Sequence, residues 1–163
     1  MKSNWYVDYV NEKVTPLYPF GHGLSYTTFE YGNLSVRPEQ ARSGESVDVS
    51  LTVRNVGNVA GDEVVQLYIC DEYASLPRPV KELKGYRRVT LNPNEERTLT
   101  FHLPVDQLAF YDENLELMVE AGRTTIMVGS SSEDIRLRGE FNITGASKTN
   151  VAERVFICPV TIK

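Results

Sequence analysis

Carboxylates are the residues of this chain most able to do chemistry, because two of them across a reacting bond can act as nucleophile and general acid. The chain has 22 Asp and Glu residues. Three adjacent pairs stand out, Asp62-Glu63, Asp71-Glu72 and Asp112-Glu113, and all fall at expected turns or strand ends. Carboxylates in such places are usually solvated or cap a turn, so we predict no catalytic residue among them.

The histidine, cysteine and serine residues also form no recognisable metal-binding or catalytic motif. His22 and His102 are the only histidines, and Cys70 and Cys158 the only cysteines, too few for a zinc site at short ligand spacing. Ser130-Ser131-Ser132 has no histidine nearby to act as its base. No glycine-rich loop follows a strand and opens a helix, as a phosphate site requires. We therefore predict no metal site and no cofactor.

Aromatic side chains gather in residues 16–28, together with two prolines and two glycines. Proline fixes φ and glycine admits unusual backbone angles, so we expect an irregular segment. Exposing so many rings to water would be unfavourable, so we expect the segment to be packed. We predict that Tyr18, Phe20, His22 and Tyr26 pack at a junction with a neighbouring domain.

The remaining aromatic residues raise the question of sugar binding. The chain has nine Tyr and six Phe, and pyranose rings stack well on aromatic faces. Tyr68, Tyr73 and Tyr86 are the candidates on or near strands. Tyrosine is also common in strands and at domain contacts, so packing is the favoured interpretation.

Composition and charge exclude several function classes. The formal net charge is −5 and the charged residues are interleaved, whereas nucleic-acid surfaces need clustered Lys and Arg. No apolar stretch approaches the roughly 20 residues of a membrane-spanning helix. We expect no nucleic-acid partner and no membrane contact, and the sequence assigns no compartment.

Alternation of apolar and polar residues predicts β-strands. It is clearest where Val47, Val49, Leu51 and Val53 alternate with polar residues. Turn residues, such as those at 55–58, 92–94 and 121–123, separate the strands. The pattern recurs at 65–69, 99–103, 115–119, 126–128 and 135–137. With no amphipathic helix between them, these runs predict an all-β antiparallel sandwich of seven or eight strands. Residues 144–153 are expected to form a polar loop, and 155–158 a late strand.

Several blocks together resemble one family. Residues 16–29, PLYPFGHGLSYTTF, are similar to the stretch that leads into the C-terminal domain of family-3 glycoside hydrolases, which include β-glucosidases and β-xylosidases. Four further blocks match in the same order: 53–68, 78–86, 108–112 and 128–137. In that family the region is a fibronectin type III-like domain, so the resemblance implies the same fold as the strand pattern.

The resemblance also implies a division of the chain. Residues 1–15 would be a remnant of a preceding α/β domain and 16–28 a packed irregular linker. Residues 29–143 would be the fibronectin type III-like domain, and 144–163 a C-terminal extension.

The catalytic residues of the family lie elsewhere. Its nucleophile stands in a Ser-Asp-Trp-like context in a barrel domain, about 5–5.5 Å from its acid/base partner. The only Trp here is Trp5, which Asn4 precedes. The resemblance therefore implies a non-catalytic accessory domain of a β-glycosidase, whose partners are the parent's catalytic domains. The alternatives are a carbohydrate-binding module and an adhesive or protein-interaction sandwich. We also expect weak self-association of the isolated domain.

Overall fold

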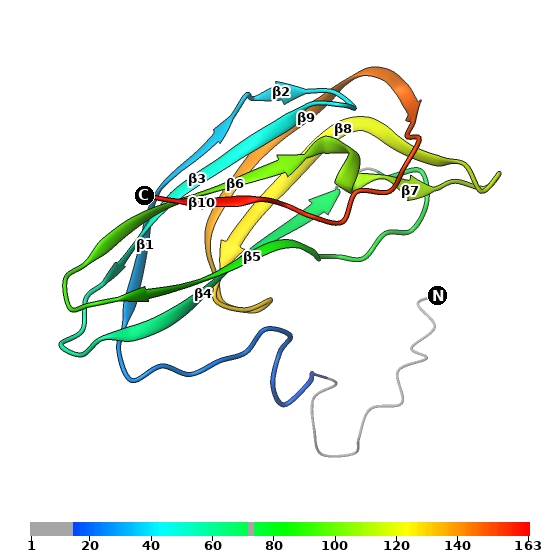
Figure 1. Ribbon diagram of the computed structural model, residues 1–163. Helices are drawn as coiled ribbons and strands as arrows, with labels where there is room; N and C mark the ends of the chain where they lie inside the picture. The colour runs from blue at the N-terminus through cyan, green and yellow to red at the C-terminus, as the bar shows by residue number, and fades with distance from the viewer. Residues whose placement is uncertain (1–14, 72–73) are drawn as a thin grey trace, which may run out of the picture.

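The computed structural model describes residues 15–71 and 74–163 and contains a β-sandwich (Figure 1). Sheet A has the strand order β1-β3-β6-β10, and sheet B has the order β2-β9-β8-β4-β5, with β7 also paired to β8. The predicted all-β fold is confirmed, with ten strands in place of seven or eight. The strands are β1 (Phe29–Arg37), β2 (Gln40–Ala41), β3 (Ser46–Asn55), β4 (Gly61–Asp71), β5 (Glu82–Leu91), β6 (Glu96–Pro104), β7 (Phe110–Tyr111), β8 (Leu117–Gly129), β9 (Ile135–Asn150) and β10 (Val160–Ile162).

Some residues of the sequence predictions lie outside the described ranges. These are residues 1–14, which include Asn4 and Trp5, and the loop residues Glu72 and Tyr73. Within the described ranges, the only helical turn is the 3-10 turn η1, Val105–Leu108. No helix there is long and apolar enough to cross a membrane.

The core consists of the apolar faces that the alternation predicts. In β3, Val47, Val49, Leu51 and Val53 are all buried, each with at most 1% of its surface exposed. Antiparallel pairing with β6 places them beside the apolar residues of that strand, and sheet B supplies the facing layer. The buried residues contributed by β6 and β4 are Leu99, Phe101, Leu103, Val65, Leu67 and Ile69.

The strand β4 departs from simple alternation because both of its faces are covered. Gln66 and Tyr68 point away from the core layer of Leu67, yet they are also buried. The Tyr68 hydroxyl donates a hydrogen bond of 2.6 Å to Gln66 Oε1. Irregular backbone at Gly21 and Ser130 packs over the outer face at Gln66, which is why this part of the strand is buried on both sides.

Two boundary predictions in the second half of the chain are wrong. The expected turn at 121–123 lies inside β8, and the expected polar loop at 144–153 continues β9 as far as Asn150. Antiparallel pairs such as Val119 with Thr149 hold the polar part of β9 in place. Backbone hydrogen bonds need no apolar side chains, so the side-chain pattern gave no sign of this extension.

Leu115 and the last strand are also not where the sequence pattern predicts them. Leu115, assigned to a strand, occupies a tight turn with φ of 62° and is exposed. The late strand is Val160–Ile162, paired to β6, and not residues 155–158.

The C-terminal tail closes one edge of the sandwich. Thr98 and Lys163 exchange two backbone hydrogen bonds of 2.9 Å, which fix β10 on the edge of β6. Ahead of β10, the Cys158 side chain lies against Gly85 and Phe101. Burial raises the pKa of the Cys158 thiol to about 12. The expected extension is thus built into the sheet structure.

Candidate functional site

The aromatic segment, residues 16–28, lies along the outside of the sandwich next to β4 (Figure 1). Three hydrogen bonds attach its backbone. Gln66 Nε2 donates to the Gly21 carbonyl at 3.1 Å, the Ser132 amide to the Phe20 carbonyl at 2.9 Å, and the Val56 amide to the Thr28 carbonyl at 2.9 Å. Gly21 has φ of 78°, which favours glycine. A Cβ on Gly21 would also collide with the Gln66 amide, so this close approach requires glycine.

The large side chains of the segment do not pack on this chain's own sandwich, contrary to the expectation of a packed segment. Attachment through backbone atoms leaves the side chains pointing away. Their exposed fractions are 87% for Leu17, 67% for Tyr18, 66% for Phe20, 93% for Leu24 and 103% for Tyr26.

The four predicted junction residues occupy different places. Tyr18 and His22 form a tilted ring pair with centroids 5.2 Å apart. Phe20 lines a cavity beside them, whereas Tyr26 projects from the segment. The structure therefore brings three of the four close together and leaves Tyr26 apart as an exposed ring.

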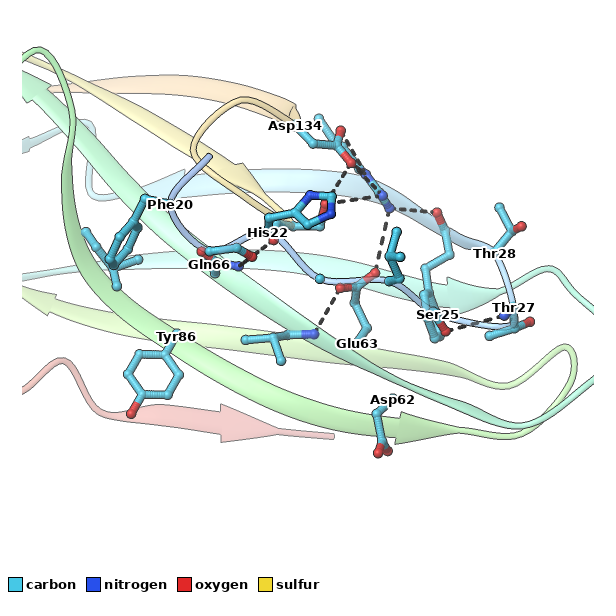
Figure 2. A pocket seen from close by; sticks show the side chains of 18 residues that line it. Phe20, His22, Ser25, Thr27, Thr28, Asp62, Glu63, Gln66, Tyr86 and Asp134 are labelled. Atoms are coloured by element: carbon cyan, nitrogen blue, oxygen red, sulfur yellow. Dashed lines mark hydrogen bonds and ion pairs between the residues drawn. The ribbon is translucent and has the colours of Figure 1, made fainter. Parts of the chain in front are cut away.

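The cavity has a volume of about 490 Å³ and lies between residues 20–28 and sheet B. Figure 2 shows that its lining mixes rings with carboxylates: Phe20 and Tyr86 lie at one end, and Glu63 and Asp134 toward the other. The lining residues come from the aromatic segment, from β4 and β5, and from the β8–β9 connection. Apolar and polar groups thus share one hollow at the root of the segment.

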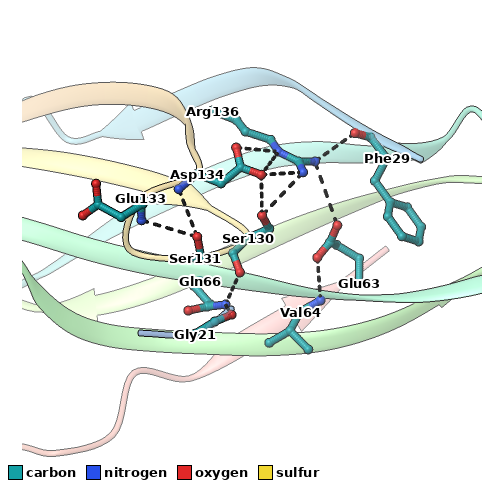
Figure 3. Close-up of polar contacts among 10 residues, drawn as sticks. All are labelled: Gly21, Phe29, Glu63, Val64, Gln66, Ser130, Ser131, Glu133, Asp134 and Arg136. Atoms are coloured by element: carbon teal, nitrogen blue, oxygen red, sulfur yellow. Dashed lines mark hydrogen bonds and ion pairs between the residues drawn. The ribbon is translucent and has the colours of Figure 1, made fainter. Parts of the chain in front are cut away.

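Arg136 organises the polar side of this cavity (Figure 3). Its guanidinium donates to the Phe29 carbonyl at 2.9 Å and to Asp134 Oδ2 at 2.8 Å. It also lies 4.7 Å from the centre of the Tyr31 ring. Glu63 Oε2 is 3.9 Å from Arg136 Nη1. One cation therefore pairs with two carboxylates, one from β4 and one from the β8–β9 connection.

The pKa values of the two carboxylates, Glu63 and Asp134, are shifted in opposite directions. Burial raises the pKa of Glu63 above its usual value, despite the nearby arginine. Hydrogen bonds from Arg136 and Ser130 lower the pKa of Asp134. The two pKa shifts differ in sign because Glu63 lies in strand β4, whereas Asp134 lies in the exposed β8–β9 connection.

Asp62 and Asp112, which belong to two of the carboxylate pairs named from the sequence, each accept hydrogen bonds within the domain. Asp62 accepts hydrogen bonds from Arg88 and Thr90. Asp112 accepts from the amides of Asn114 at 2.9 Å and Glu116 at 3.0 Å, which confirms the turn-capping interpretation for this residue. Among the described residues, no group of three or more His, Cys, Asp or Glu is placed to hold a metal ion.

His102 has partners on both sides and is not simply solvated. Its Nδ1 lies 2.6 Å from Asp48 Oδ1 and its Nε2 lies 3.2 Å from Thr161 Oγ1. These residues stand on three neighbouring strands of sheet A, so the ring ties β10 to the sheet.

Comparison with known proteins identifies the domain. A family model described as the fibronectin type III-like domain matches residues 63–132. Thermostable β-glucosidase B of Acetivibrio thermocellus is 44% identical over 141 residues, which cover 86% of this chain and 19% of that protein. The crystal structure of a Listeria innocua β-glucosidase in complex with glucose has 40% identity and a TM-score of 0.79, covering 88% of this chain and 20% of that one. This chain is a fibronectin type III-like domain of family-3 glycoside hydrolases.

A β-xylosidase of Formosa agariphila is also similar, with 48% identity over 119 residues that cover 73% of this chain and 16% of the relative. The fibronectin type III-like domain thus spans about a fifth of the length of the relatives it matches. The matched region includes β4, β5, β6, β7 and β8 and the Ser130-Ser131-Ser132 turn. The family resemblance inferred from the sequence blocks is confirmed.

Sequence reasoning missed the polar groups that shape the cavity. The alternation at 135–137 and 65–69 would place Arg136 and Gln66 on the polar faces of their strands. Both instead bind backbone carbonyls far away in the sequence, at Phe29 and Gly21. A polar residue inside an otherwise apolar run, as Gln66 is, was the one available signal of a buried contact.

Proposed function

We propose that this fibronectin type III-like domain is a non-catalytic accessory domain that docks on the catalytic domains of a β-glycosidase and stabilises them. The observation that carries the proposal is the set of large apolar side chains displayed by residues 17–26. Soluble domains seldom expose so many contiguous apolar groups unless another surface covers them. Tyr18, Phe20, His22 and Tyr26 would lie at that junction, with residues 1–15 as the remnant of the preceding α/β domain.

The reaction of the parent is proposed from its relatives. They are named β-glucosidases and a β-xylosidase, so the parent would hydrolyse terminal β-linked glucose or xylose. The chemistry would belong to the part of such a chain that this domain does not cover. Within this domain, Glu63 and Asp134 both face Arg136, an arrangement that suits a structural ion cluster.

Docking can be tested by mixing this chain with separately produced catalytic domains of its parent and following complex formation by sedimentation. We expect a complex that is weakened by Leu24→Ser and Tyr26→Ser, because each removes exposed apolar surface from the junction. Val80→Ser is the matched control, since Val80 is equally exposed but lies outside the segment. Absence of a complex, or equal weakening by all three changes, would count against docking through this segment.

A further inference from the structure

The cavity beside Phe20 has the features of a ligand site. Its volume of about 490 Å³ falls in the range of roughly 300–1,000 Å³ typical of small-molecule sites. Its polar groups converge from strands β4 and β9 and from the aromatic segment, so folding brings them together from distant parts of the chain. Figure 2 shows rings and carboxylates pointing into the same space.

The polar groups of the cavity are fixed by contacts within the protein, before any ligand binds. Arg136 is fixed by the Phe29 carbonyl, by Asp134 and by the face of Tyr31. Glu63 Oε1 accepts from the Val64 amide at 2.9 Å, but Oε2 is 3.9 Å from the nearest guanidinium nitrogen. That separation is too long for a hydrogen bond. A mostly buried carboxylate therefore keeps one oxygen available to a hydroxyl donor.

The balance of charge excludes one ligand class. Asp62 lines the cavity but is paired with Arg88, which leaves Glu63 and Asp134 against the single positive charge of Arg136. An anionic ligand would meet one excess negative charge in a partly desolvated site. The ligand must be neutral or positively charged.

The apolar side of the cavity favours a neutral ligand with flat apolar faces. Phe20 and Tyr86 line one end and are both largely exposed. Aromatic rings provide large, rigid contact areas, and tyrosine adds a polar tip. A pyranose has this dual character, with hydroxyls at its edge and C–H groups on its faces.

We propose that this cavity binds one pyranose unit of a neutral carbohydrate. Hydroxyls would donate to Glu63 and accept from Arg136, and the sugar face would lie against Tyr86 and Phe20. The site lies wholly within this chain, so the proposal does not depend on docking to other domains.

The test is an amide NMR titration of the isolated chain with methyl β-glucoside, methyl β-xyloside and, as a charged comparison, methylammonium. We expect saturable shifts for the two glycosides, confined to residues that line the cavity. Tyr86→Ala and Glu63→Gln should each weaken binding at least about tenfold, equivalent to about 1.4 kcal/mol. Tyr111→Ala, which changes an exposed tyrosine on β7, should leave the affinity unchanged.

Three outcomes would overturn the proposal. They are no saturable shift with either glycoside, equal affinity in Tyr86→Ala and the unchanged chain, and tighter binding of methylammonium than of the glycosides. Matching urea midpoints for the variants would show that lost binding is not lost folding. The sugar titration uses the isolated chain and the docking experiment adds the catalytic domains, so each can fail alone even though Phe20 belongs to both sites.

Discussion

At the scale of single residues, Gln66 and Leu67 stabilise the domain in different ways although they are neighbours in β4. Leu67 is completely buried between the sheets, and Gln66 is nearly as buried on the other side of β4. Leu67 contributes apolar burial, whereas Gln66 uses its amide to hold the carbonyls of Gly21 and Ser130. A substitution with Asp at either position would place a carboxylate in a buried site, so both changes should destabilise the domain.

Truncation of Leu67 gives a sharper prediction. Leu67→Ala should lower the free energy of unfolding by about 2–5 kcal/mol, because it removes buried methyl groups and leaves a cavity. Val64→Ala, in the same strand but partly exposed, should cost less than about 1 kcal/mol. Urea unfolding of both variants measures this difference, and equal midpoints would contradict the described core.

We expect the contributions of Glu63 and Asp134 to folding stability to depend on pH in opposite directions. The folded pKa of Glu63 is raised, so its contribution to stability is full below the ordinary Glu pKa of about 4.3 and is lost as pH rises through the folded value. The advantage of the unchanged chain over Glu63→Gln should therefore shrink as the pH rises above about 4.3.

Asp134 supplies the matched control with the reverse sign. Its folded pKa is lowered, so its contribution is present above the ordinary Asp pKa of about 3.9 and is lost as pH falls through the folded value. The advantage over Asp134→Asn should therefore be full above about pH 5 and shrink as the pH falls below that value. Urea midpoints at several pH values give both slopes, and parallel slopes would refute the assigned environments.

At the scale of elements, the C-terminal tail is the least expected feature of the domain. Its late strand completes sheet A, and the residues before it cover the edge between the sheets. The contact requires a small residue at position 85, since an added Cβ would lie 3.0 Å from Phe101 and 3.2 Å from Cys158.

Two glycine substitutions measure how tightly the tail is packed. Gly85→Ala should destabilise the domain by about 1–3 kcal/mol, because the tail or Phe101 must shift. Gly122→Ala is the control, since a Cβ there meets no atom within 4 Å, and it should change stability by less than about 0.5 kcal/mol. A neutral Gly85→Ala would mean that the tail is only loosely attached.

The strands that alternate on a half-buried face were predictable from the sequence, and those formed by polar residues were not. In β3 buried apolar residues alternate with more exposed polar ones, so the sequence pattern predicts the strand directly. At the end of β9, by contrast, the residues from Gly145 to Asn150 are mostly exposed, and backbone pairing with β8 holds Lys148, Thr149 and Asn150. The sequence likewise marked Phe20 and Tyr18 as unusual, but the cavity depends on where Arg136 meets a segment more than 100 residues away.

At the scale of the whole molecule, the domain is a sandwich that leaves the large apolar side chains of residues 17–26 exposed. The core is complete without the segment, so the exposed rings add little to the stability of the isolated chain. Their exposure has a cost in solution, where a second copy can cover them.

Self-association should therefore depend on the segment. We expect weak, concentration-dependent dimerisation of the isolated chain that Phe20→Ser reduces, because the change removes an exposed ring held by backbone contacts. Tyr111→Ser, on β7, should leave association unchanged. Sedimentation across a range of concentrations distinguishes these outcomes, and dimerisation insensitive to Phe20→Ser would move the interface elsewhere.

The central claim is that this domain stabilises a glycosidase without catalysing hydrolysis itself. The most direct measurement follows nitrophenyl β-glucoside and β-xyloside hydrolysis by the chain alone, by the parent's catalytic domains alone and by the two together during thermal inactivation. We predict no turnover by the chain alone, and slower inactivation of the catalytic domains when the chain is present. The claim would be contradicted by turnover of the purified chain that disappears when one of its carboxylates is replaced, or by an inactivation rate that the chain leaves unchanged.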